Sequence, residues 1–155
     1  MPVFWASFEE SGREADFWWQ MMHEFFKDAE VLYANDRLLG CLDRCHGAIE
    51  RGLKALCIEM GVLSGLELSH ELYELAERCN ILGKLGDVGA SMIKKYSKLH
   101  YNAAYPEDIR HFKLLCAPDD VKMVYHTTKR ILTCLGGYES YFRKQRECRE
   151  ADSVR

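Results

Sequence analysis

Two basic side chains near the middle of the chain have the types and spacing needed to act on a phosphodiester. In the stretch "KKYSKLHYNAAYPED", Lys95 precedes His100 by five positions. A histidine can serve as general acid or base when a ribose 2′-hydroxyl attacks a phosphate, and Lys95, or Lys94 beside it, can stabilise the phosphorane. Lysine supplies a point charge, however, and not the bidentate fork of an arginine.

Aromatic residues follow directly. Tyr101 and Tyr105 can stack on a nucleotide base, so Lys95, His100, Tyr101 and Tyr105 form a candidate nucleotide-binding group. A simpler interpretation stays open beside it. A charged histidine is favoured near a helix C-terminus by the helix dipole, and tyrosines often bury the ring while the hydroxyl stays in water.

The cysteines raise the question of a metal site. Cys41, Cys45 and His46 lie within two turns of one predicted helix, and zinc would need a fourth ligand from Cys57 or Cys79. Cys45 also falls in an apolar stripe, so we predict no metal site and no cofactor. The seven cysteines are odd in number and lack CxxC spacing, which favours free, buried thiols in a reducing compartment.

Two further features have competing interpretations. Glu50 and Lys54 are four residues apart, in the order that stabilises a helix, and we favour a solvated ion pair over a polar groove. Trp18 and Trp19 must point to different faces of one helix. We place Trp18 in the core and predict that Trp19 is exposed, where it would mark a partner surface.

The elements that position these residues are all helical. Helix-forming residues dominate, and no strand-length alternating run occurs. The pattern predicts helices over about 13–33, 37–60, 70–80 and 87–101, and a fifth from Pro118. Asn35 or Asp36 can cap the second helix, and the glycine pair at 136–137 ends or kinks the fifth. We therefore predict one all-α domain over residues 1–155, an antiparallel up-and-down bundle of about five helices with its core over about residues 15–142 and frayed ends.

The second helix has the strongest pattern. Its apolar stripe recurs at steps of three and four residues and comprises Leu38, Leu42, Cys45, Ile49, Leu53, Leu56 and Met60. Gly40, Gly47 and Gly52 lie beside this stripe, which indicates a neighbouring helix that packs closely.

Composition limits the partners. The formal net charge is −3 over 155 residues, so the chain lacks the basic surface that general DNA binding requires. No apolar run approaches the roughly 20 residues that span a bilayer, and no leader pattern is recognisable. These features predict a cytoplasmic protein that does not enter membranes.

One stretch resembles a known family. "CHGAIERGLKAL", from Cys45 to Leu56, resembles the signature of HEPN domains (higher eukaryotes and prokaryotes nucleotide-binding domains). "HELYEL" from His70 resembles the family's next short helix, and "AAYPED" partly resembles its Arg-Tyr-Pro-Asp ending of the fourth helix. The resemblance runs from about Ala15 to Phe142. It implies a helical bundle, often a homodimer, with a role near nucleotides or RNA and frequently beside a nucleotidyltransferase.

The chain departs from the family at its most informative position. Ala104 stands where the family has the arginine of Arg-Tyr-Pro, and the Arg-x4–6-His pair of ribonuclease members is absent. We therefore expect a non-catalytic module that dimerises and binds a nucleotide, RNA or a partner protein, such as a nucleotidyltransferase. The alternative is a metal-independent, toxin-like endoribonuclease that uses Lys95 and His100.

Overall fold

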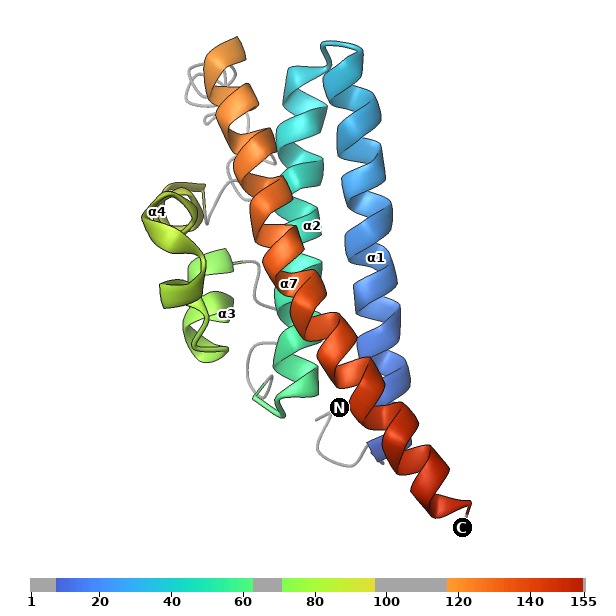
Figure 1. Cartoon of the computed structure of the whole chain (residues 1–155). Helices are drawn as coiled ribbons and strands as arrows, with labels where there is room; N and C mark the ends of the chain where they lie inside the picture. The colour runs from blue at the N-terminus through green and yellow to red at the C-terminus, as the bar shows by residue number, and fades with distance from the viewer. Residues whose placement is uncertain (1–7, 63–70, 97–116, 155) are drawn as a thin grey trace.

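The computed structural model describes residues 8–62, 71–96 and 117–154, and this part of the chain is helical with no strand. Helices α1 (Phe8–Ala34) and α2 (Leu38–Glu59) form an antiparallel hairpin. The short helix α3 (Leu72–Arg78), a 3-10 turn at Leu82–Lys84 and α4 (Gly86–Tyr96) lie on one side of α2 (Figure 1). The long helix α7 (Pro118–Ser153) crosses the α1–α2 hairpin and extends past its end (Figure 1). The predicted all-α fold is confirmed.

Helix α2 is the centre of the bundle. From Cys45 to Ile58 nearly every side chain is buried, since α1, α3 and α7 all pack on this helix. Most residues of the predicted apolar stripe are buried, but Leu38 is half-buried and Met60 is 41% exposed. Fully buried side chains in this helix include Leu42, Ile49, Leu53 and Leu56.

Two glycines let the neighbouring helices approach α2, as the small residues predicted. A Cβ built on Gly47 would lie 2.6 Å from Cδ1 of Phe25 in α1. A Cβ on Gly52 would lie 2.5 Å from Sδ of Met22 and 2.8 Å from Cδ1 of Leu135 in α7. These distances are shorter than van der Waals contact, so a larger residue at either position would force its neighbours in the closely packed interior to move. Gly52 thus marks the point where three helices meet.

The prediction that Trp19 is exposed is wrong. Trp19 is fully buried, and its Nε1 lies 3.5 Å from Oε2 of Glu59. Trp18 is half-buried, and Phe17 is the residue that reaches solvent, at 58% exposure. The face of α1 that packs inward therefore contains Trp19, and Trp18 lies partly buried at its margin. This face is formed by Ala15, Trp19, Met22, Phe26 and Ala29.

The expected solvated pair of Glu50 and Lys54 is also corrected. The two side chains do pair, with Nζ 3.5 Å from Oε1, but they are only 3% and 5% exposed. Arg51 contacts the other oxygen of Glu50 at 3.1 Å and lies over the ring of Phe25. The pair is enclosed because α2 is covered on nearly every side.

Two predicted helix boundaries differ as well. Neither Asn35 nor Asp36 caps α2, whose N-cap position is Arg37 without a side-chain hydrogen bond. Asp36 instead has a φ of 55° in the turn, and the Asn35 side chain donates back to the carbonyl of Val31 at 2.8 Å. The glycine pair at 136–137 does not end α7, which continues as one helix to Ser153.

Candidate functional site

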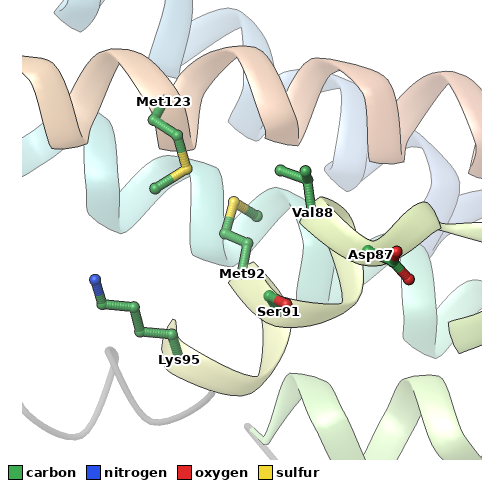
Figure 2. Close-up of a pocket in the computed structure, with 6 residues that line it drawn as sticks. All are labelled: Asp87, Val88, Ser91, Met92, Lys95 and Met123. Carbon is green, nitrogen blue, oxygen red and sulfur yellow. The ribbon is translucent and has the colours of Figure 1, made fainter.

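A cavity between α4 and α7 contains Lys95, the one member of the candidate nucleotide-binding group that the structure describes. It has a volume of about 310 Å³ and is open to solvent. Five of its residues come from one face of α4 and one comes from α7. They are Asp87, Val88, Ser91, Met92, Lys95 and Met123 (Figure 2).

The polar residues of this cavity follow a simple helical pattern. Asp87, Ser91 and Lys95 are four residues apart, so they line one edge of α4. Asp87 lies in the first turn of α4 and Lys95 in the last. Both charges have the sign that the helix dipole favours at their ends. The Cα atoms of Asp87 and Lys95 are therefore about 12 Å apart along the helix axis, and the two residues lie at opposite ends of the α4 segment that lines the cavity.

The wall between these charged ends is apolar. Met92 points from α4 toward α7, and Met123 points from α7 toward α4 (Figure 2). Met92 is 4% exposed, whereas Met123 is 38% exposed at the mouth of the cavity. Methionine side chains are flexible and polarizable, and they make favourable contacts with aromatic rings. This wall can therefore accept a flat ring, with Lys95 at the rim for an anionic group.

Only part of the predicted candidate group can be placed. Lys95 is at the cavity, while His100, Tyr101 and Tyr105 lie outside the described residues. Asp87, Ser91 and Met123 were not predicted from the sequence as site residues. The four-residue spacing from Asp87 to Lys95 was a signal for the first two. Met123 could not be found, because it joins the cavity only through the way α7 crosses α4.

A second open cavity, of about 370 Å³, lies where the end of α2 meets the middle of α7. Tyr138 is at its edge, and the Nζ of Lys84 lies 5.2 Å from the centre of that ring. A hydrogen bond from Lys84 to the Tyr138 hydroxyl raises the pKa of the lysine. Its lining is mostly aromatic and apolar and consists of Met60, Cys134, Gly137, Tyr138, Tyr141 and Phe142.

The thiols considered for zinc divide into two pairs. Cys41 and Cys45 are hydrogen-bonded on α2, and this bond lowers the pKa of Cys41. Cys57 contacts Cys79 instead. Within residues 8–62, 71–96 and 117–154, no three His, Cys, Asp or Glu side chains are grouped to hold a metal ion.

The comparison with protein families decides the assignment. The model of the HEPN domain matches residues 15–139, which include most of α1, the whole of α2, α3 and α4, and about the first three-fifths of α7. The chain belongs to the HEPN domain family. The match includes the signature stretch on α2 and the candidate site at Lys95. No curated protein and no solved structure shows significant similarity to this HEPN protein. Among its described helices, none is long and apolar enough to cross a membrane.

Proposed function

We propose that this HEPN protein is a non-catalytic module that forms a homodimer and binds a nucleotide in the cavity between α4 and α7. The observation that carries the proposal is the combination of Lys95 with the two methionines, Met92 and Met123, in one open cavity. A cation at the rim suits a phosphate, and an apolar wall suits a base. Cavities of this volume with few polar groups are typical of small-molecule sites.

The separation of the charged groups favours binding over cleavage. Phosphodiester cleavage needs a base and a cation that act on the same phosphate. In the described cavity the backbone positions of Asp87 and Lys95 are about two helical turns apart, so the two side chains start from opposite ends of the lining helix. They can contact the two ends of one nucleotide, with Lys95 at the phosphate and Asp87 at the base or the sugar.

The first prediction is that Lys95→Ala weakens nucleotide binding. Isothermal titration with AMP and ATP should show an affinity at least about tenfold lower, since a hydrogen bond to a charged group contributes about 1.5–3 kcal/mol. Lys94→Ala is the matched control, because it removes the same charge from an exposed neighbour that does not line the cavity. Equal affinities in the wild type and Lys95→Ala would contradict the assignment.

The second prediction is that the protein has little or no ribonuclease activity. A structured RNA should stay intact with the purified protein in EDTA, which excludes a contaminating metal-dependent nuclease. The absence of the family's Arg-x4–6-His pair and the net charge of −3 both support this expectation. Clear cleavage that is lost in His100→Ala would instead support the toxin-like endoribonuclease.

The third prediction concerns the homodimer. Trp19 is buried, so the support comes from other apolar side chains at the surface. Phe17 and Val31 on α1 are 58% and 63% exposed. Sedimentation at tens of micromolar protein should give the mass of a dimer, because association depends on concentration. A monomer at that concentration would refute this part of the proposal.

A nucleotidyltransferase is the protein partner that we propose. The support is the HEPN assignment itself, because a HEPN module is frequently encoded beside a nucleotidyltransferase. The simplest test of this partner is to identify the genes that lie next to the gene of this protein. A neighbouring nucleotidyltransferase gene would support the pairing, and co-purification of the two proteins would test it directly.

A further inference from the structure

Two thiols from different helices meet in the core, away from the α4–α7 cavity. Sγ of Cys57 on α2 lies 2.8 Å from Sγ of Cys79, the residue that ends α3. Both cysteines are free thiols, with exposures of 0% and 1%. The two sulfurs are less than an ångström farther apart than the bonded distance of about 2.05 Å.

Further hydrogen bonds hold the two side chains toward each other. The Cys57 thiol lies 3.7 Å from the carbonyl oxygen of Leu75 in α3. The Cys79 thiol lies 3.7 Å from the carbonyl oxygen of Leu53 in α2. Each thiol is therefore placed against the backbone of the opposite helix. Bond formation needs little rearrangement, because both sulfurs already face one another across the α2–α3 contact.

We propose that Cys57 and Cys79 are an oxidation site, at which a hydroperoxide converts the two thiols into a disulfide that joins α3 to α2. One thiol loses its proton and attacks the peroxide, which breaks the O–O bond, releases an alcohol or water and leaves a sulfenic acid. The second thiolate then attacks that sulfur and releases hydroxide, which takes up a proton to become water. In total, two electrons pass from the thiols to one hydroperoxide.

The surroundings of the pair make this reaction slow. Hydrogen bonding to Cys57 and burial both raise the pKa of Cys79, and only the thiolate is nucleophilic. The oxidant must also reach buried sulfurs, which requires α3 to open from α2 for short periods. Helix α3 has only seven residues, and short elements of this kind open more readily than the global core. The rate should therefore increase with pH and with conditions that loosen α3.

The disulfide would anchor the layer that carries the α4–α7 cavity. Cys79 is followed by the 3-10 turn Leu82–Lys84 and then directly by α4. A covalent link at Cys79 therefore fixes the start of this layer to the central helix. Because the link also restricts the unfolded chain, the oxidised protein should melt roughly 5–10 °C higher than the reduced protein.

Peptide mapping tests the site directly. The full-length protein is treated with hydrogen peroxide, alkylated under denaturing conditions and digested with trypsin without reduction. Cleavage after Lys54, Arg78 and Lys84 should give residues 55–78 linked to residues 79–84, two hydrogens lighter than the sum of the peptides. Dithiothreitol should separate them and remove the gain in melting temperature.

Two variants complete the experiment. Cys79→Ala should lose both the linked peptide and the thermal shift, whereas Cys148→Ala, at an exposed cysteine, should keep both. If Cys79→Ala does not fold, the peptide map of the wild-type protein still tests the proposal. Alkylation of both Cys57 and Cys79 after full oxidation of the exposed thiols would overturn the proposal. A disulfide from either residue to a different cysteine would overturn it as well.

Discussion

Leu53→Asp unfolds the protein. Leu53 is fully buried in the middle of α2, and its carbonyl oxygen faces the Cys79 thiol across the α2–α3 contact. An aspartate there loses the packing of a leucine and places an unpaired carboxylate in the core. The free energy of unfolding should fall by more than about 4 kcal/mol, which is comparable to the whole stability of many domains. Circular dichroism should show no cooperative melting at room temperature or above.

Leu39→Asp is the matched control for this prediction. It makes the same chemical change on the same helix, but Leu39 is 54% exposed. Its effect on the free energy of unfolding should stay within about 0.5 kcal/mol, as for most surface substitutions. Wild-type melting of Leu53→Asp would mean that α2 is not the central helix of the bundle.

Arg146→Ala has the second largest expected effect. Arg146 of α7 donates to Oε1 of Glu59 at the end of α2, and it donates to Oδ1 of Asp16 in α1 at 2.6 Å. The side chain of Glu59 is only 4% exposed. Loss of the guanidinium leaves that carboxylate buried with the indole of Trp19 beside it. We expect the free energy of unfolding, measured by urea titration, to fall by about 3 kcal/mol, because an unpaired buried charge is costly.

Two further variants separate charge from packing. Arg143→Ala removes a guanidinium that is 52% exposed and 3.9 Å from Asp16, and it should cost less than about 0.5 kcal/mol. Glu59→Gln combined with Arg146→Ala should recover part of the lost stability, since the amide carries no charge. If the double variant is no more stable than Arg146→Ala, the effect comes from lost packing and not from the buried carboxylate.

The sequence was most informative where one pattern dominates. In α2 the apolar positions recur without competition, and small residues mark the close contacts at Gly47 and Gly52. The identity of the central helix could therefore be predicted, and the fold class followed from it. The family signature lies on the same helix, which explains why the family could also be recognised from sequence.

The orientation of α1 could not be predicted in the same way. Phe17, Trp18 and Trp19 are consecutive and all apolar, so several different faces of this helix look hydrophobic. The choice depends on where α2 and α7 lie, and both contact α1. Trp19 faces inward, and its indole nitrogen lies 3.5 Å from Oε2 of Glu59 at the end of α2. A pattern within one helix holds no information on that contact.

The same physical reason explains the errors at the polar residues. The pairing of Glu50 with Lys54 followed from spacing alone, but their burial depends on elements that cover α2. At the candidate site, Lys95 could be selected for its charge, whereas Met123 enters the cavity from α7. Sequence spacing shows which residues share a face of one helix. Only the packing of the helices shows which residues of other helices lie against that face.

Helix α7 has a consequence for how the molecule opens. Its first half is buried at Val121, Val124, Ile131 and Leu135, while most side chains after Phe142 are exposed. Figure 1 shows the last turns running beyond the α1–α2 hairpin. Amide protons in the first half of this helix should therefore exchange slowly with solvent, and those in the last turns should exchange rapidly. Local opening is easiest where tertiary contacts are few. The boundary falls near Arg146, which pairs with Asp16 of α1 and with Glu59 at the end of α2, because nearly all side chains after it are exposed.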